Sequence, residues 1–482
     1  MQKFYPENFE SKIGFDRIRE MLHEKCLSNM GIEWVDEMQF QNTFESIATQ
    51  LGEVDEFCRI VREFDSFPSS HFYDLREALQ KITIEGRFLE TSELFDLKRS
   101  LESVRAIVFF FNKQEVEVFP LLNKKIANVQ VFPYIYDRID SILNKFGKIR
   151  DNATPELANI RRDILTRQAN MSKRLHAILK QAQKDGLVEE DATVSIRDGR
   201  AVIPISAGNK RKLKGIIYDE SSTGKTSYVE PNEIVEMNNE IRELEYAERR
   251  EIVRILTDFS NDIRPYLDDL FSSYDFLGEI DFIRAKALLA VEFNAIKPEF
   301  AANPGFDWLQ AIHPLLMKTL KREKRKIVPL NIRLTAEKHI LLISGPNAGG
   351  KSVCLKTVGL LQYMLQCGLL IPLSEGSRTG IFSRIFIDIG DEQSLENDLS
   401  TYSSHLLNMK HFVKNSNENT LILIDEFGTG TEPMLGGAIA ESILDKLNQM
   451  RTFGVITTHY TNLKHFASSA EGIENGAMLY DS

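Results

Sequence analysis

The residues from Gly345 to Ser352 have the types and the spacing of a phosphate-binding loop. They read Gly-Pro-Asn-Ala-Gly-Gly-Lys-Ser and fit the pattern G-x-x-x-x-G-K-[ST]. In such a loop, backbone N–H groups surround the phosphates, the lysine reaches the β and γ oxygens, and the hydroxyl holds Mg²⁺. The residues predicted to bind a nucleotide are Gly345, Pro346, Asn347, Ala348, Gly349, Gly350, Lys351 and Ser352.

The segments on either side of this loop support the same interpretation. Leu341–Ile343 is an apolar run typical of a buried strand, and Val353–Gln366 has the apolar spacing of a helix. The N-terminus of that helix would add its partial positive charge to the phosphate site. A strand before the loop and a helix after it argue against a chance match to a short pattern. The sequence therefore predicts that the chain binds a nucleoside triphosphate.

Two acidic residues end a second apolar run. Leu421–Ile424 is typical of a parallel strand buried on both faces, and Asp425 and Glu426 follow it directly. We expect Asp425 to hold the Mg²⁺ shell together with Ser352, and Glu426 to orient the attacking water in phosphoryl transfer. The alternative is an acidic helix cap ahead of Gly428.

His459 ends a third apolar run, residues 454–458. A histidine at the carboxyl end of a strand, beside the nucleotide crevice of an open α/β sheet, can sense the γ-phosphate. A single histidine is more often structural, but its place after a third such strand favours the functional interpretation. The candidate catalytic residues are therefore Lys351, Glu426 and His459.

Length and composition restrict the class of protein. A chain of 482 residues suits three or four domains. The net charge of −11 argues against binding nucleic acid by bulk electrostatics, so such contacts would need local basic patches. The four cysteines show no ligand spacing, the N-terminus does not resemble a signal peptide, and no apolar run is long enough to span a membrane. We expect a cytoplasmic protein without a membrane partner.

Much of the N-terminal half has helical periodicity. From Phe15 to about Glu190, apolar residues recur at three- and four-residue spacing, which predicts a helix bundle. Residues 151–185 are rich in Arg and Lys and resemble a long exposed arm. Residues 234–269 are dense in Glu and Arg at i,i+4 spacing, which suits the returning half of an antiparallel arm.

A small β module is predicted between these two helical segments. Residues 193–205 alternate around Asp198-Gly199, which predicts a hairpin, and two further strands are expected at 214–218 and 226–229. The loop between the hairpin and these strands is basic, and such a loop could contact a phosphate backbone. The alternative is an ordinary solvated loop. Its candidate nucleic-acid-binding residues are Lys210, Arg211, Lys212 and Lys214.

The order of these segments resembles the MutS family of DNA mismatch-repair ATPases over nearly the whole chain. The Gly-Pro-Asn opening of the loop separates this family from other loop NTPases. The absence of a mismatch-reading domain ahead of the helices, with residues 390–394 and the hairpin 196–205, resembles the MutS-two branch. The motifs that carry the resemblance lie at residues 311–316, 345–352, 390–394, 400–402, 425–431 and 457–460.

The resemblance implies a multidomain α plus α/β fold. It has a helical core, long helical lever arms with a small β clamp tip, and an ABC-type P-loop ATPase domain with a mostly parallel sheet. The expected divisions are 1–120, an N-terminal helical domain; 121–190, the first half of core and lever; 191–232, the β clamp module; 233–305, the returning helices; and 306–482, the ATPase domain, C-terminally incomplete.

The resemblance also implies a function. The chain would be an ATP-hydrolysing clamp that uses ATP and Mg²⁺ and senses branched DNA or recombination intermediates rather than mismatches, thereby suppressing recombination. One alternative is an ATPase that acts on rRNA or stalled ribosomes. Another is a structural tether with negligible turnover.

Three further site residues are implied by the family pattern. Ser400 would reach the γ-phosphate of a partner subunit in a homodimer formed by the ATPase domains, although a plain helix N-cap explains the same serine. Gln393, with Asp391, would sense the metal or couple the site to the arm. Ile327 stands where the family often stacks adenine on an aromatic residue, so base contact would be apolar.

The C-terminus departs from the family. The sequence stops at Ser482, where the family has one further strand and the helices that lock two ATPase domains together. The MutS-two branch usually continues into a coiled linker and a nuclease-like Smr domain. A truncated chain and a natural short form both fit. We therefore do not expect nuclease activity from these residues, nor do they by themselves establish dimerisation.

Overall fold

The computed structural model describes residues 3–64, 67–197, 199–345, 350–390, 401–429 and 432–478. The chain folds into two compact units. The first unit comprises residues 1–74, 103–130 and 272–482, and the second comprises 75–102 and 131–271. Both helical and α/β parts are present, as the sequence predicted. The five divisions expected from the family remain a prediction.

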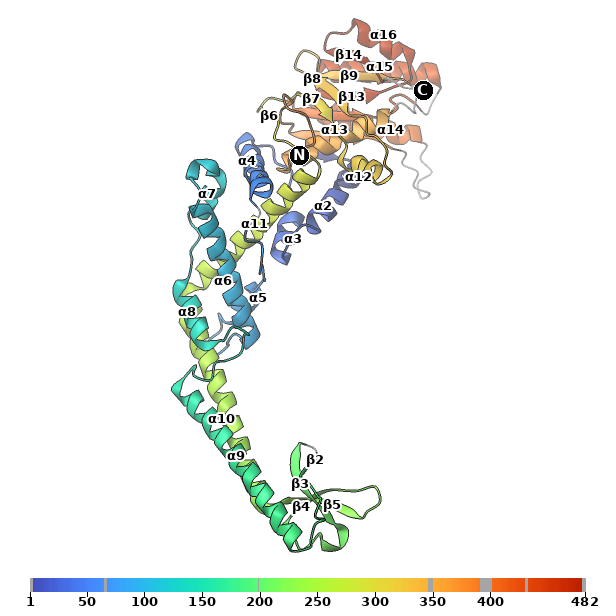
Figure 1. Ribbon diagram of the computed structural model, residues 1–482. Helices are drawn as coiled ribbons and strands as arrows, with labels where there is room; N and C mark the ends of the chain where they lie inside the picture. The colour runs from blue at the N-terminus through green and yellow to red at the C-terminus, as the bar shows by residue number, and fades with distance from the viewer. Residues whose placement is uncertain are drawn as a thin grey trace. The chain divides into compact units, whose positions relative to one another are not determined.

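A parallel sheet forms the centre of the first unit (Figure 1). Each neighbouring pair of strands in it runs parallel. The carboxyl ends of its strands therefore lie along one edge. The predicted mostly parallel sheet is thus confirmed. Within the described residues, its strands stand in the order β1 (Phe4–Tyr5), β11 (Arg384–Asp388), β12 (Thr420–Ile424), β13 (Phe453–Thr457), β9 (Ile340–Ser344) and β14 (Ile473–Ala477).

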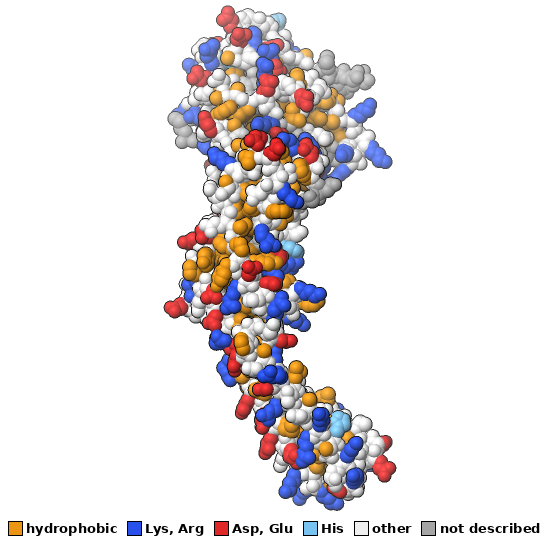
Figure 2. All heavy atoms as spheres, turned by 60° about the vertical axis from the view of Figure 1, so that its left-hand side comes forward, with side chains coloured by type: hydrophobic (Ala, Val, Ile, Leu, Met, Phe, Trp, Pro, Cys, Tyr) orange, Lys and Arg blue, Asp and Glu red, His pale blue; other side chains and the backbone are white. Residues whose placement is uncertain are grey.

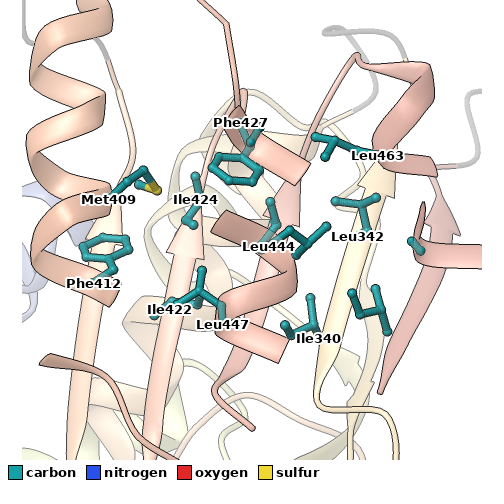
Figure 3. Packing of buried hydrophobic residues seen from close by; sticks show 14 of the residues in the cluster. Ile340, Leu342, Met409, Phe412, Ile422, Ile424, Phe427, Leu444, Leu447 and Leu463 are labelled. Atoms are coloured by element: carbon teal, nitrogen blue, oxygen red, sulfur yellow. The ribbon is translucent and has the colours of Figure 1, made fainter. Parts of the chain in front are cut away.

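Helices cover both faces of this sheet. Helices α14 (Thr401–Asn415), α15 (Pro433–Gln449) and α16 (Thr461–Ser469) pack on one face, and their apolar side chains meet alternate residues of the strands (Figure 3). Helix α13 (Lys351–Gln366) contacts β12 and β13. All five residues of β12 are buried, as are those of β13, which explains their continuous apolar sequences.

The N-terminal residues belong to the same unit as the sheet. β1 pairs with β11, with Phe4 opposite Ile385. The helices α1 (Phe9–Ile13), α2 (Phe15–His23) and α3 (Asn29–Asp36) follow. Rings of this segment surround Tyr363 of α13, at centroid distances of 4.6 Å for Phe15 and 5.3 Å for Phe9. This segment falls in the predicted N-terminal helical domain, but the strand β1 was not predicted.

A second sheet lies in the same unit. Its strands, in the order β6 (Glu299–Phe300), β10 (Arg378–Thr379), β7 (Phe306–Ala311) and β8 (Leu330–Leu334), form a four-stranded sheet within the described residues. Helix α12 (Pro314–Arg322) connects β7 to β8. The nitrogen Nδ1 of His313 caps this helix by accepting a hydrogen bond from Leu316 N at 3.3 Å.

Charged side chains of helix α11 (Leu267–Glu292) contact neighbouring helices in the first unit. Its Asp281 accepts hydrogen bonds from the backbone N–H groups of Leu27 and Ser28 ahead of α3. Its Glu279 pairs with Lys125 of α7 (Pro120–Ile126), which also lies 3.1 Å from Glu53 of α4 (Phe44–Glu63). These contacts fix α11 against its neighbours.

Helices α9 (Pro155–Lys184) and α10 (Asn232–Ile263) form an antiparallel pair in the second unit. Ion pairs join Arg161 to Glu248, Arg167 to Glu240 and Arg174 to Glu233. The residue number falls on α10 as it rises on α9, so the two helices run in opposite directions. The predicted antiparallel return is therefore present. Helices α5 (Arg76–Lys81), α8 (Pro133–Ile142) and part of α6 (Thr91–Asn112) complete the unit.

The β module joins α9 to α10. Its strands stand in the order β2 (Ser195–Arg197), β3 (Arg200–Ser206), β5 (Thr226–Pro231) and β4 (Gly215–Glu220), and all pairs are antiparallel. Arg197 lies opposite Arg200, which confirms the predicted hairpin, and Gly199 has the positive φ of 75° that such a turn needs. Apolar residues of β3 and β5 pack on both helices. No helix among the described residues is long and apolar enough to cross a membrane.

Candidate nucleotide-binding site

Three neighbouring strands end at one point of the parallel sheet. Strand β9 ends at Ser344, immediately before Gly345, and β12 ends at Ile424, immediately before Asp425. Strand β13, which pairs with both, ends at Thr457, two residues before His459. The fold therefore brings the loop and both downstream motifs to the same edge.

The described ends of the loop have backbone conformations that favour glycine. Gly345 has a φ of 138° and Gly350 a φ of 80°. Gly350 is the N-cap of α13, and no side chain caps this helix end in the described part of the chain. The first-turn N–H groups of a helix have no partner within it, so this end suits an anion. Residues 346–349, also predicted to bind nucleotide, lie outside the described residues.

Lys351 is buried, and its ammonium group contacts Gly345 and His459. Nζ donates a hydrogen bond to the carbonyl oxygen of Gly345 at 2.6 Å and lies 3.0 Å from Nε2 of His459. Because the ammonium can only donate, Nε2 must be the acceptor nitrogen of the imidazole in this contact. Burial lowers the pKa of Lys351, and the carboxylates of Asp425 and Glu426 partly oppose this shift.

Thr457 links the two acidic residues. Its hydroxyl donates to Oδ1 of Asp425 at 2.5 Å and accepts a hydrogen bond from the backbone N–H of Glu426 at 2.8 Å. Thr457 is fully buried, and Asp425 is 9% exposed. The sequence analysis included Thr457 in a family motif but gave it no role. Its position at the carboxyl end of β13 was the available signal.

The backbone turns sharply at Glu426. Its φ of 50° lies in the left-handed region, which is unusual for glutamate. The carbonyl oxygen of Glu426 accepts a hydrogen bond from the Thr429 hydroxyl at 2.8 Å, and the N–H of Phe427 donates to the carbonyl oxygen of Thr457. These contacts stabilise the turn. The side chains of Asp425 and Glu426 therefore do not point to opposite faces of the sheet, as they would in a continued strand.

Asp388 forms a polar network next to this turn. One oxygen of its buried carboxylate lies 2.6 Å from Nδ1 of His405, and the other accepts from Asn408 at 2.8 Å. Asn408 in turn accepts from the hydroxyl of Tyr5 at 2.7 Å. The backbone of Asp388 accepts from the N–H of Asp425. The network thus joins β1, β11 and α14 at the edge of the site, and the sequence analysis had not predicted it.

A cavity of about 400 Å³ lies beside the first turns of α13. Val353 and Lys356 line it from α13, and His313 lines it ahead of α12. Lys12 and Arg17 add two more basic side chains from the α1–α2 region. Ile327 is not among the lining residues; it is half-buried in the segment between α12 and β8.

The other predicted site residues lie in three different parts of the chain. Ser352 is exposed at the start of α13, on the same helix end as Lys351. Gln393 and Ser400, like Asp391, lie outside the described residues, and α14 begins directly after Ser400. The four basic residues 210, 211, 212 and 214 lie in the second unit, between β3 and β4.

Mg²⁺ needs few protein ligands when a nucleotide supplies oxygens. No group of three or more His, Cys, Asp and Glu side chains that could hold a metal is found in the described ranges. Asp425 and Ser352 offer hard oxygen atoms at this edge, which fits Mg²⁺ bound jointly with phosphates rather than a site made by protein alone.

Comparisons with known proteins show the family of this chain. Residues 341–481, which contain the loop, most of β9 and the strands β10–β14, match the family model of MutS domain V. The chain is 37% identical over 468 residues to endonuclease MutS2 of Alkaliphilus oremlandii. It is 36% identical over 471 residues to endonuclease MutS2 of Pelotomaculum thermopropionicum. The chain belongs to the MutS2 branch of the MutS family.

The similarity to MutS2 covers nearly all of this chain but only part of its relatives. The two alignments include 97% and 98% of the chain, and 58% and 59% of the respective relatives. The chain thus spans somewhat more than half the length of the MutS2 proteins it matches. Those relatives are named endonucleases.

Proposed function

We propose that this MutS2-family chain binds and hydrolyses ATP with Mg²⁺. The observation that supports the proposal is the convergence of Lys351, Asp425 and His459 beside the N-terminus of α13, which has no side-chain cap among the described residues. A buried ammonium, a metal-binding carboxylate and free helix N–H groups are the parts that phosphoryl transfer requires. Nuclease activity is not part of the proposal.

Each residue has a distinct task in this mechanism. The ammonium of Lys351 would exchange its hydrogen bond to Gly345 for one to a β- or γ-phosphate oxygen. Asp425 and Ser352 would hold Mg²⁺, which neutralises charge on the phosphates when bound. Glu426 would accept a proton from the attacking water. His459 would position the γ-phosphate through its contact with Lys351.

A dimer would complete the site. In this proposal Ser400 contacts the γ-phosphate of a second copy, and α14, which starts one residue later, directs its N-terminus to the same anion. Exposed apolar side chains near this edge support a contact surface: Leu407 is 53% exposed on α14, and Met434 is 82% exposed on α15. A Glu426→Gln variant held in Mg-ATP is therefore expected to dimerise in light scattering, and a persistent monomer would contradict this part.

The α9–α10 pair and the β module would form the lever and clamp. Arg and Lys side chains are visible over the module, with acidic residues among them (Figure 2). Closure of the ATPase domains would be transmitted along the helices to a nucleic-acid channel, and affinity would come from phosphate contacts and shape rather than from base edges. Branched DNA is the proposed target, and suppression of recombination the proposed consequence.

Titration of two variants with ATP tests the nucleotide site. Lys351→Ala should lose most of its ATP affinity because the ammonium is the cation closest to the phosphates. Glu426→Gln should bind ATP as tightly as the wild type, because it keeps the metal ligand and the loop, and serves as the matched control. Equal affinities for wild type and Lys351→Ala would contradict the loop assignment.

Steady-state phosphate release tests hydrolysis itself. The wild type should release phosphate, and Glu426→Gln should fall by at least about 100-fold, the usual contribution of a general base. Negligible release by the wild type would instead support a tether in which ATP only sets conformation.

Competition binding separates the two proposed targets. With Glu426→Gln held in Mg-ATP, an excess of four-way DNA junctions should displace ribosomes from the chain if DNA is the target. Preferential retention of ribosomes would favour the ribosome-acting alternative. The clamp mechanism would be unchanged, but rRNA would take the place of DNA.

A further inference from the structure

Lys286 of α11 is an unusual residue because it is a lysine with 2% exposure. Lysine is almost never fully buried without a charged partner. Among the described residues, no carboxylate lies within ion-pair distance of its ammonium. Instead, Nζ lies 4.1 Å from the ring centroid of Phe282 and donates a hydrogen bond to the carbonyl oxygen of Cys367 at 2.9 Å. Burial lowers the pKa of Lys286 to about 8.

Cys367 is the C-cap of α13, the helix whose other end follows the phosphate loop. The remaining carbonyl groups of this helix end have other donors: Met364 accepts from Leu369 N, and Gln366 accepts from Gln41 N. Lys286 satisfies the carbonyl of Cys367, and its charge faces the partially negative end of the helix. The opposite end of α13 has no side-chain cap in the described residues and is the proposed phosphate site.

When nucleotide is present, helix α13 would therefore contact a charged group at each end: phosphate at its N-terminus and the ammonium of Lys286 at its C-terminus. It is a continuous helix of 16 residues, about 24 Å long at 1.5 Å per residue. A packed helix moves as a unit, so a shift at its N-terminus reaches Cys367. The only ammonium that donates to this helix end, among the described residues, belongs to α11.

Space beside Lys286 allows α11 to change position. A cavity of about 540 Å³ is lined by Phe282, Ile283 and Lys286 of α11 and by residues of α3 and α4. This pocket is half open to solvent, and a helix next to such space can shift without expelling neighbouring side chains. Helix α11 begins at Leu267, within the span of the second unit, so the chain itself continues from α11 into that unit.

We propose that Lys286 is a positioning residue that couples the nucleotide state of α13 to the position of α11. This inference rests on the proposed binding of ATP. When phosphates draw the N-terminus of α13 into the loop, the carbonyl of Cys367 moves and Lys286 follows it, because a buried ammonium cannot lose its acceptor without a large cost. The displacement of α11 would be the first step from the ATPase site toward the helical arms.

Hydrogen exchange of the α11 amides tests the coupling. In the wild type, Mg²⁺ with a nonhydrolysable ATP analogue should change the exchange rates of peptides covering residues 279–291 by roughly fivefold or more, the lower range of coupling between sites. Lys286→Met, which keeps the length and packing of the side chain but removes the charge, should bind the analogue normally and lose this change. Lys286→Arg, which retains a cation, should keep part of it.

Glu279→Gln is the matched control. Glu279 is on the same helix and lines the same cavity, but its partner is Lys125 of α7 and not α13. This variant should therefore retain the nucleotide-dependent change in α11. A purely structural role for Lys286 would lower thermal stability and leave the change intact, so the two readouts distinguish the roles.

The outcomes separate this inference from the proposed function. If the wild type binds the analogue but α11 exchange does not respond, or if Lys286→Met responds as the wild type does, the coupling is refuted and ATP binding stands. If the wild type does not bind the analogue, both fail. Should Lys286→Met not fold, Lys286→Arg decides, because a response as large as that of Glu279→Gln would refute the role of Lys286.

Discussion

Thr457 contacts both acidic residues of the site through one hydroxyl. It donates to Asp425 and accepts from the N–H of Glu426, so it orients the proposed metal ligand and the turn that carries the proposed general base. The contact with Asp425 is buried, and there a lost partner leaves a polar group without compensation at a cost of about 1–3 kcal/mol. The geometry of the acidic pair therefore depends on a residue from the neighbouring strand.

Replacement of Thr457 by Val should lower kcat for ATP hydrolysis by roughly tenfold, which corresponds to about 1.4 kcal/mol of barrier. The size of the side chain is kept, so KM should change little. Thr457→Ser retains the hydroxyl and should hydrolyse ATP at close to the wild-type rate. A Val variant with wild-type kcat in a phosphate-release assay would show that Thr457 does not position the acids.

At the scale of single elements, α12 has an N-cap that can titrate. Burial, and then the nearby charge of Lys356, lower the pKa of His313 to about 4. Protonation of Nδ1 would remove the acceptor for Leu316 N and add positive charge to the positive end of the helix. The folded unit therefore disfavours protonated His313.

This shift makes the stability of the first unit depend on pH. The folded pKa lies below the ordinary value of 6.5, so the unfolded chain binds the proton first and stability is lost as pH falls from about 6.5 toward 4. At pH 5 the loss should be about 2 kcal/mol from this group. His313→Asn keeps a capping acceptor without titration and should unfold in urea at a higher midpoint than wild type at pH 5, but not at pH 7. Parallel midpoints at both pH values would contradict this.

The basic loop of the β module contains charges in two different states. Lys210 lies 3.0 Å from Glu220, which already compensates its charge. Arg211, Lys212 and Lys214 are exposed, and no carboxylate of the described residues forms an ion pair with them. Replacing these three by Ala should reduce the salt dependence of DNA binding by up to about 0.9 in log–log slope per contact.

Lys210→Ala is the control within the same loop, because its charge is already paired with Glu220. It should change the slope less than any of the three exposed cations does. The measurement is fluorescence anisotropy of a labelled four-way junction over a range of salt concentrations. An unchanged slope in the triple variant would indicate that this loop is an ordinary solvated loop that does not contact the DNA phosphates.

At the scale of the whole molecule, the chain has two units but one predicted nucleotide site. The described residues that converge on this site all belong to the first unit. Binding that favours a folded state stabilises it by about 2.7 kcal/mol at a ligand concentration 100 times the Kd. Mg²⁺ with a nonhydrolysable ATP analogue should therefore raise the unfolding temperature of the first unit more than that of the second.

Calorimetry and limited proteolysis measure this difference. The calorimetric transition of the first unit should move, and cleavage within α9 and α10 should be protected less than cleavage within α14 and α15. Lys351→Ala should show neither effect. Equal stabilisation of both units would indicate that they unfold together. The two compact units would then not be separate units of cooperative unfolding.

Local patterns in the sequence determined the parts of this protein that depend on neighbouring residues. The loop, the apolar runs that became β9, β12 and β13, and the hairpin at residues 195–206 each have short-range signals in periodicity, glycine and charge. The antiparallel return of α10 was predicted from the Glu and Arg residues at i,i+4 spacing in residues 234–269. These features could be predicted because the physical cause lies within a few residues or in a regular repeat.

Only the tertiary structure decided which distant groups complete the site. β1 pairs with β11 across more than 370 residues, Thr457 contacts Asp425 from another strand, and Lys286 reaches the end of α13 from α11. The local sequence does not specify these partners, because a hydroxyl, a short strand or a lysine occurs in many contexts. Their roles arise from the order of strands in the sheet and from the burial of polar groups, which must find a partner wherever the fold places one.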